Sequence, residues 1–256
     1  RQMCIRDSNH EAANYWADEG AERIVLAREL SLEEIAEIRA KTPKELEIEA
    51  FVHGAMCISY SGRCLISQYM TGRDANHGAC AQPCRWNYSL MEEKRPGQFF
   101  PVEEDGRGTY LYNSKDMCMI EHVPELIEAG ITSFKIEGRN KTAYYAACVT
   151  GAYRAAIDTY KKDPENFVLP QFCRDEVNKV SHREYYTGFY FGNQENGQHY
   201  GDSQYIREYE VVGMPVECDD SGKAVFALKN RFFDGEELEL IQPGQAPYVF
   251  RAENVT

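Results

Sequence analysis

Four cysteines, Cys57, Cys64, Cys80 and Cys84, lie close together in one glycine-containing stretch of the chain. Four thiolates in one segment can complete the tetrahedral ligand set of a metal ion or hold the irons of a [4Fe–4S] cluster. A buried thiol or a disulfide is the simpler explanation for an isolated cysteine, but it does not explain a group of this kind. The quartet therefore predicts a metal or iron–sulfur site.

The spacing of the quartet bears on which metal it would bind. Structural zinc sites usually pair their ligands on tight turns, with few residues between them. Here six residues separate Cys57 from Cys64, and three separate Cys80 from Cys84. This spacing favours an iron–sulfur cluster in a pocket built from loops, with zinc as the alternative. Cys118 is a further candidate for the fourth ligand.

The remaining cysteines and the absence of targeting signals indicate a reducing compartment. The chain has nine cysteines, an odd number, and shows neither a signal peptide nor an apolar run long enough to span a bilayer. A secreted disulfide framework would need paired cysteines. We therefore expect a cytoplasmic protein that has no membrane partner.

The charge of the chain limits the kind of partner that it can bind. Its formal net charge of −13 argues against a non-specific nucleic-acid binder, which would be basic overall, and its hydrophobic content of 43% is enough for a core. Any contact with RNA should therefore be local. Basic residues near the motifs could provide it: Arg63, Arg73, Arg85, Lys135, Arg139 and Lys141.

Strand and helix patterns alternate along the first part of the chain. A helix over 9–19 precedes a strand over 23–29, and Ser31 with Glu34 forms a capping box that opens the next helix before a strand over 46–53. After the cysteines, Ser114 is expected to cap a helix over 117–129, followed by a strand over 131–137 and a helix over 142–161. This alternation predicts βα units on a parallel sheet, either doubly wound or a barrel.

Side-chain alternation within the strands favours the barrel. In the strand ending at Glu137, Phe134 and Ile136 share one face, whereas Lys135 and Glu137 share the other. The strand over 46–53 likewise has one apolar face and one face bearing Glu47, Glu49, Phe51 and His53. Helices covering both faces of an open sheet would bury these charges at a high free-energy cost, whereas a barrel offers a polar mouth.

In a barrel, functional residues lie at the carboxyl ends of the strands. The charged residues at those ends would then gather on one rim, where the cysteine segment begins: Arg28, Glu29, His53, Glu137 and Arg139. Ion pairs that only hold the rim together are the alternative interpretation.

The strand count and the composition suggest how the chain is divided. About four barrel-type strands can be recognised, too few for an eight-stranded barrel, so we expect the amino-terminal half of a TIM-like (β/α) barrel to be missing. We predict this half-barrel with the cysteine loop over 1–162, a helical linker over 163–200 and a small, truncated β-rich domain over 201–256, with strands near 204–216, 224–229, 237–242 and 248–252.

Several segments resemble a known family. The run from Glu49 to Ser67 is similar to the signature of the collagenase-like peptidase family U-32. The segments 76–86, 134–139 and 181–188 resemble blocks of its bacterial tRNA-hydroxylating branch. The resemblance covers most of residues 9–256, and the chain departs from it at the amino end.

The resemblance implies an iron–sulfur enzyme that forms 5-hydroxyuridine at the wobble position of tRNA, with prephenate rather than molecular oxygen used in the pathway. Carried over to this sequence, the ligands of a 4Fe-4S cluster would be Cys57, Cys64, Cys80 and Cys84. Relatives that act on ribosomal cytidine or in ubiquinone synthesis support the type of chemistry more than the substrate.

The charged rim suits this chemistry. Lys135 and Arg139 could bind the carboxylates of a prephenate-like co-substrate, Glu137 could move a proton, and His53 is a candidate acid or base.

Two aromatic residues and two other functions complete the interpretation. Tyr60 and Trp86 could stack on RNA bases, although core packing is their commoner role. Literal peptidase activity is disfavoured because the sequence has no His-Glu-x-x-His run and no evident partner for a nucleophilic cysteine. A zinc-stabilised RNA-binding module without catalysis is the third possibility.

Overall fold

The computed structural model of the chain describes residues 6–57, 59–61, 63–86, 89–91, 97, 99–101, 114–139, 141–192 and 205–255. Its mixed α/β backbone forms two compact units, and each is discontinuous in sequence. The first unit comprises the described parts of 1–137 and 183–204, and the second those of 138–182 and 205–256. The division into segments 1–162, 163–200 and 201–256 stays a prediction.

Two helices of the first unit begin at side-chain caps, of which the one at Ser31 was predicted. The side chain of Asn9 accepts a hydrogen bond from the Ala12 amide at 2.9 Å, and helix α1 (His10–Asp18) follows it. Helix α2 (Leu32–Ala40) opens with the predicted capping box, in which the Ser31 amide donates to the Glu34 carboxylate at 2.8 Å. These bonds satisfy amide groups that have no partner within the first helical turn. Both predicted helices are confirmed.

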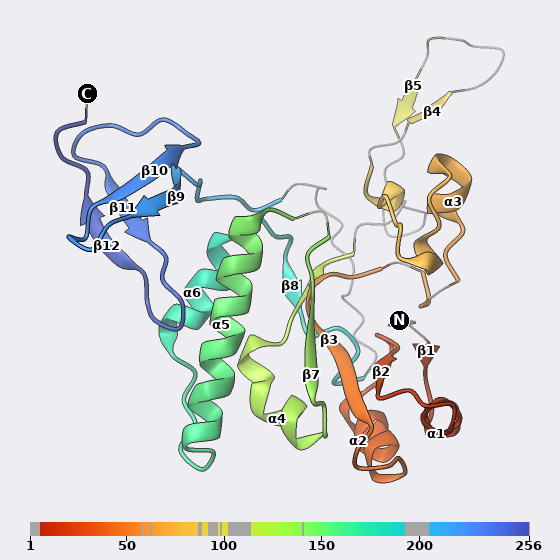
Figure 1. Cartoon of the computed structure of the whole chain (residues 1–256). Helices are drawn as coiled ribbons and strands as arrows, with labels where there is room; N and C mark the ends of the chain where they lie inside the picture. Colours follow the sequence, from red (N-terminus) through yellow and green to blue (C-terminus); the bar gives the residue numbers. More distant parts are fainter. Residues whose placement is uncertain are drawn as a thin grey trace. The chain divides into compact units, whose positions relative to one another are not determined.

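Six strands of the first unit form one mixed sheet (Figure 1). Strand β3 is central, with β2 and β7 parallel to it and β6 antiparallel, while β1 and β8 pair with β2 and β6. Among the described residues the strands do not close into a barrel, so the predicted partial barrel is not confirmed. The strands are β1 (Arg6–Asp7), β2 (Arg23–Leu26), β3 (Glu47–Ala55), β6 (Asp116–Cys118), β7 (Ser133–Glu137) and β8 (Tyr185–Tyr186).

The helix predicted over 117–129 is wrong over its first half. Strand β6 occupies this region and pairs with the end of β3, where Asp116 is opposite Ala55. The 3₁₀ helix η3 (Ile120–His122) and the short helix α4 (Val123–Glu128) follow it. A short apolar run satisfies both helical and strand patterns, and pairing with the distant β3 decides between them here.

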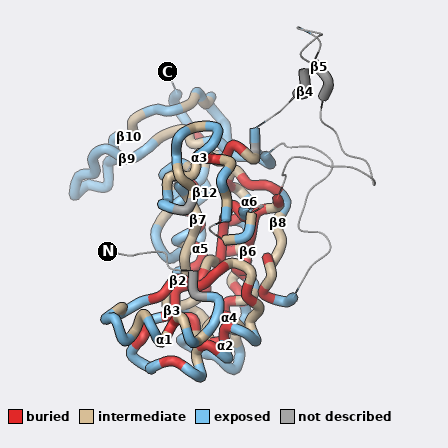
Figure 2. Tube along the Cα trace, turned by 90° about the vertical axis from the view of Figure 1, so that its right-hand side faces the viewer, coloured by how far each residue is buried: buried red, intermediate tan, exposed pale blue. Residues whose placement is uncertain are grey.

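The core of the first unit lies along the central strands and the two helices α2 and α4. Figure 2 shows buried residues concentrated on β2, β3 and β6 and on these helices. Large side chains from each element are almost fully excluded from solvent. They include Ile24, Ile48, Val52, Met117, Ile35, Ile38, Val123 and Leu126.

The second unit combines two helices with two β-hairpins. Helix α5 (Ala143–Lys162), capped by Thr142, and helix α6 (Gln171–Lys179) pack together and bury Cys148 and Cys173. None of the described helices is long and apolar enough to cross a membrane. The antiparallel pairs are β9 (Gly213–Cys218) with β10 (Ala224–Leu228), and β11 (Glu237–Leu240) with β12 (Tyr248–Arg251). The last three lie close to the predicted strands, whereas β9 begins nine residues after the start of the strand predicted over 204–216.

Candidate active site

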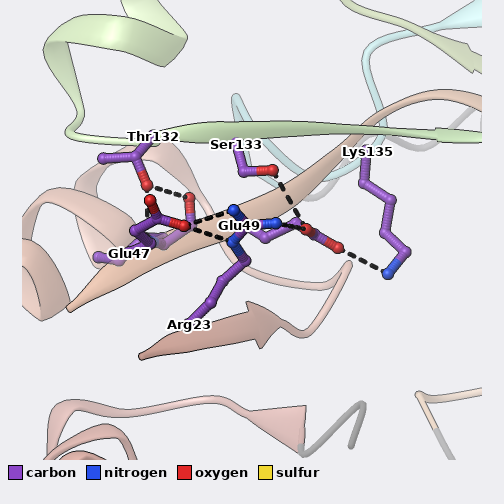
Figure 3. Close-up of polar contacts among 7 residues, drawn as sticks. Arg23, Glu47, Glu49, Thr132, Ser133 and Lys135 are labelled. Atoms are coloured by element: carbon purple, nitrogen blue, oxygen red, sulfur yellow. Dashed lines mark hydrogen bonds and ion pairs between the residues drawn. The ribbon is translucent and has the colours of Figure 1, made fainter. Parts of the chain in front are cut away.

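The predicted charged face of β3 and β7 exists, and at its start it carries a buried carboxylate with several partners (Figure 3). Glu49 is 5% exposed and accepts hydrogen bonds from Lys135 Nζ at 2.6 Å and from Ser133 Oγ at 3.1 Å. Arg23 lies 3.4 Å from the same carboxylate and also pairs with the more exposed Glu47. A buried carboxylate needs such compensation. Lys135 therefore has a structural partner already.

At the other end of the same face, Arg28 connects the two strands. Its guanidinium donates to the Ala55 carbonyl at 2.8 Å, lies 3.4 Å from the Glu137 carboxylate, and stacks 3.7 Å from the centroid of the Phe51 ring. The side chains of Arg28 and Glu137 are only 15% and 19% exposed. Partial burial strengthens the interaction between their charges. The structure thus brings the predicted catalytic Glu137 next to a fixed cation.

Gly54 allows β3 and β7 to approach closely beside Glu137. Its φ of +106° lies in a region that L side chains rarely adopt, and a Cβ atom there would be 2.3 Å from the carbonyl oxygen of Glu137. Only glycine fits such an approach without displacing the neighbouring strand.

The alternation that predicts His53 on the charged face breaks at Val52. Phe51 is opposite Lys135, but His53 is opposite Ile136, so β3 contains an extra residue in a β-bulge. The His53 ring is 1% exposed, and its Nε2 lies 3.3 Å from the Tyr185 hydroxyl. His53 thus does not follow the register of Lys135 and Glu137.

The chain leaves β3 into the segment that carries the four cysteines, and we call the described part of residues 57–86 the cysteine lobe. It contains helix α3 (Ile66–Thr71) and the 3₁₀ helices η1 (Ala75–His77) and η2 (Pro83–Arg85). The fully buried Ser67 accepts a hydrogen bond from the Ala81 amide at 3.0 Å, which ties α3 to the second cysteine pair. Helices α3 and η2 accordingly lie side by side (Figure 1).

One contact anchors the lobe to the sheet. The carboxylate of Glu29, which follows Arg28, accepts a hydrogen bond from the Ser61 amide at 2.7 Å. Ser61 lies between Cys57 and Cys64, so Glu29 fixes the first cysteine loop. Its second oxygen, Oε2, is buried and has no hydrogen-bond partner among the residues that the structure describes.

The thiol of Cys57 is influenced by both the lobe and the strand end. Crowding by protein atoms desolvates this thiol and raises its pKa above the ordinary value, even though Cys57 exposes much of its surface. The positive charge of Arg28 opposes the rise in pKa, and Cys64 and Cys80 add to it. The charges of Arg28, Cys64 and Cys80 therefore all act on the Cys57 thiol.

The donor set of the lobe fits an iron–sulfur cluster in kind. Cys57, Cys64, Cys80 and Cys84 are all free thiols, and cysteine thiolates are the usual ligands of such clusters. Within the described parts of the chain, however, no three His, Cys, Asp or Glu side chains are arranged closely enough to hold a metal ion. Cys118 lies apart from the lobe in sequence, opposite His53 in the β3–β6 pair.

Three further residues were predicted to contact the co-substrate or the RNA: Arg139, Tyr60 and Trp86. Arg139 is exposed and belongs to the second unit, which begins at Gly138. Tyr60 and Trp86 are 55% and 48% exposed, so neither is a core residue.

Sequence reasoning placed Arg28 and Glu29 on the rim but gave them no role. The structure makes Arg28 the contact of Glu137 and Glu29 the anchor of the cysteine loop. Two adjacent charges at the end of a buried strand are the signal that could have identified them, because charges there need partners.

The fold and the lobe define an α/β protein with a cysteine-bearing segment after its central strand. A family model described as peptidase family U32 matches residues 2–200, and one described as the peptidase family U32 C-terminal domain matches residues 207–256. The chain therefore belongs to peptidase family U32, as the resemblance of its motifs indicated.

Its relatives include RNA-modifying proteins. The chain is 40% identical to tRNA hydroxylation protein P1 of Bacillus subtilis, over 92% of this chain and 56% of that protein. It is 36% identical to tRNA hydroxylation protein P of Escherichia coli, over 92% of this chain and 60% of that protein. It is also 42% identical to the 23S rRNA 5-hydroxycytidine C2501 synthase of Escherichia coli, over 80% of this chain and 30% of that protein.

The chain spans 56% to 60% of the length of these two tRNA hydroxylation proteins. No solved structure matches it.

Proposed function

We propose that this chain carries out iron–sulfur-dependent hydroxylation of RNA, with 5-hydroxyuridine at the wobble position of tRNA as the product. The observation that carries the proposal is the 40% identity, over 92% of the chain, to a protein named for tRNA hydroxylation. The ribosomal RNA relative supports pyrimidine hydroxylation as the shared chemistry. The tRNA substrate, the prephenate-derived donor and the half-barrel architecture are the finer parts of the proposal.

Under this proposal, Cys57, Cys64, Cys80 and Cys84 hold a 4Fe-4S cluster. None of the four forms a disulfide bond, and the charges of Cys64 and Cys80 act on Cys57. Bound through all four cysteines, the cluster would supply electron transfer; with only three cysteine ligands it would also offer an open iron position. Cys118 is the alternative fourth ligand.

The side chains on the charged face would manage protons and the co-substrate. Replacing C5–H by C5–OH is a two-electron oxidation that releases a proton, and the Glu137 carboxylate, which lies 3.4 Å from Arg28, would accept this proton. Arg139 would bind a carboxylate of the prephenate-like donor, which would supply the oxygen and accept the two electrons. Lys135 would bind the co-substrate only while its ammonium group also contacts Glu49, which lies 2.6 Å away. His53 stays a candidate acid or base.

Metal analysis distinguishes this proposed function from two others, a peptidase and a zinc-stabilised RNA-binding module. A metallopeptidase of the His-Glu-x-x-His type would need a motif that this sequence does not contain. A zinc-stabilised RNA-binding module would use the same four cysteines without turnover. The metal that the chain takes up therefore discriminates between these functions.

The test is anaerobic reconstitution of the chain with iron and sulfide. We expect a brown protein with broad visible absorption and about four irons per chain. Cys64→Ala should lose the iron, whereas Cys218→Ala, at an exposed cysteine outside the lobe, should keep it. A colourless, zinc-loaded protein would contradict the proposal.

The product is tested in cells. RNA nucleosides from a strain lacking the gene should lack 5-hydroxyuridine, and a plasmid expressing the chain should restore it. Unchanged nucleosides in the deletion strain would contradict the proposed substrate.

A further inference from the structure

Most of the exposed apolar surface of the first unit is concentrated on the cysteine lobe. Among its described residues, the first unit has seven large apolar side chains that are strongly exposed, and only Tyr15 and Phe191 lie outside the lobe. Apolar groups that gather on one surface commonly mark a binding site. The five on the lobe, with their exposed fractions, are Tyr69 (91%), Leu65 (72%), Tyr60 (55%), Trp86 (48%) and Met70 (45%).

The lobe holds these side chains on an ordered support. The bond from the Ala81 amide to Ser67 fixes α3 against the second cysteine pair, and the Thr71 hydroxyl donates to the Ser67 carbonyl at 2.7 Å. Tyr69 and Met70 therefore project from a helix with fixed neighbours. An ordered backbone beneath these side chains lowers the entropy that is lost when they bind a partner.

The charge of the lobe is opposite in sign to that of the whole chain. The chain has a formal net charge of −13, yet the sequence between Cys57 and Trp86 contains three arginines and a single acidic residue, Asp74. Arg63 and Arg73 are exposed, and Asp74 lies 3.3 Å from His77. A local positive charge on an acidic protein complements phosphate groups and steers a polyanion to this surface.

We propose that the exposed face of the cysteine lobe binds unpaired nucleotides of the RNA substrate. Tyr69, Tyr60 and Trp86 stack on bases, and Arg63 and Arg73 contact phosphates. This inference rests on the proposed function, which it deepens by naming the surface that receives the RNA. Stacking needs bases whose faces are free, so the surface selects a single-stranded loop over a duplex.

The position of the lobe connects this binding to the candidate chemistry. The same segment carries the four cysteines, and Glu29 anchors it next to Arg28 and Glu137. RNA bound on the lobe is therefore held by the element that carries the proposed cluster ligands.

The experiment measures the binding of a fluorescein-labelled RNA hairpin with an unpaired, uridine-containing loop to the full reconstituted chain by fluorescence anisotropy. Tyr69→Ala should weaken binding about 5- to 100-fold, the range expected for one lost base stack. Arg73→Ala should reduce the slope of log affinity against log salt by about one. Tyr248→Ala, at a 62% exposed position on β12 of the second unit, is the matched control and should change neither quantity.

A second probe tests the selection of unpaired bases. The same RNA closed into a perfect duplex should bind more weakly than the hairpin and should be insensitive to Tyr69→Ala. Equal affinity for both RNAs would overturn the stacking argument.

The outcomes separate this inference from the proposed function. Hairpin binding that depends on Tyr69 and Arg73 supports the inference, even if the chain takes up no iron and forms no 5-hydroxyuridine. No hairpin binding, or binding that both substitutions leave unchanged, overturns it, even in an active enzyme. Loss of self-association in Tyr69→Ala with unchanged RNA binding would show a protein interface instead.

Discussion

Glu49 and Glu137 lie on the same charged face of β3 and β7, yet their surroundings differ. Glu49 is buried at 5% exposure, and Lys135 donates to it at 2.6 Å alongside Ser133 and Arg23. Glu137 is 19% exposed, and its contact with Arg28 is 3.4 Å long. A carboxylate buried this deeply serves the fold, whereas a less buried one at the strand end before the cysteine lobe is better placed to exchange a proton. Residue type and alternation alone do not distinguish the two.

The largest expected effect is on turnover. Glu137→Gln should lower the rate of RNA hydroxylation by about 10²–10⁴-fold, the usual contribution of a general acid or base. Iron content should be unchanged, and the free energy of unfolding should fall by about 1–2 kcal/mol, because the mostly buried Arg28 loses its opposite charge while the glutamine oxygen can still accept its hydrogen bond. Single-turnover nucleoside analysis measures the rate. Full activity in this variant would remove Glu137 from the site.

The second effect is on stability. Glu49→Ala should lower the free energy of unfolding by about 2–4 kcal/mol, because it leaves the half-buried Lys135 ammonium without its closest carboxylate. Glu47→Ala is the matched control, since Glu47 shares Arg23 but its side chain is 49% exposed, and it should cost less than about 1 kcal/mol. Urea unfolding measures both. Equal losses in the two variants would contradict a special role for burial.

Substitution of Gly54 tests whether β3 and β7 must approach closely beside Glu137. Gly54→Ala should cost about 2–3 kcal/mol, because the new methyl group meets the Glu137 carbonyl and the backbone is strained. Gly20→Ala has a similar φ of +89° but nothing within 4 Å of the new Cβ, so it should cost only about 1 kcal/mol. The difference between the two losses of unfolding free energy measures the steric contact with Glu137. Equal losses would mean that β7 can shift to accommodate the methyl group.

The smallest expected effect is at Arg28. Arg28→Lys should lower stability by about 1 kcal/mol, because lysine cannot stack on Phe51 while donating to both Ala55 and Glu137. Urea unfolding measures the loss. Arg154→Lys on α5, at an exposed ion pair with Asp158, is the control and should leave stability almost unchanged. An equal loss at Arg154 would show that the contacts of Arg28 play no special role.

The parts of the fold that local chemistry determines could be predicted from the sequence. The Ser31–Glu34 capping box needs only four consecutive residues, and α2 begins where it predicts. The region after Ser114 was misread because pairing with β3 is not local. Pro124 carried a usable signal, since proline is favoured in the first turn of a helix and α4 begins at Val123.

The candidate site could be predicted in its residue types but less well in its contacts. Alternation correctly placed Lys135 and Glu137 on the face of Glu49, and the cysteine spacing identified the lobe. The bulge at Val52 shifts His53 out of the alternating register, and no sequence pattern in β3 predicts this bulge. The pairing of Lys135 with Glu49 was likewise not predicted, because it depends on the register between two strands that are distant in sequence.

The first unit is completed by a late part of the chain. Tyr190 donates to the Phe51 carbonyl, and β8 adds to the sheet beside β6, but both follow the helices of the second unit in sequence. During synthesis the ribosome must therefore release α5 and α6 before the last strand of the sheet emerges. Until then, one edge strand of the nascent sheet has no pairing partner. A pause in translation near residue 182 would therefore prolong the period in which a chaperone could bind this unpaired edge.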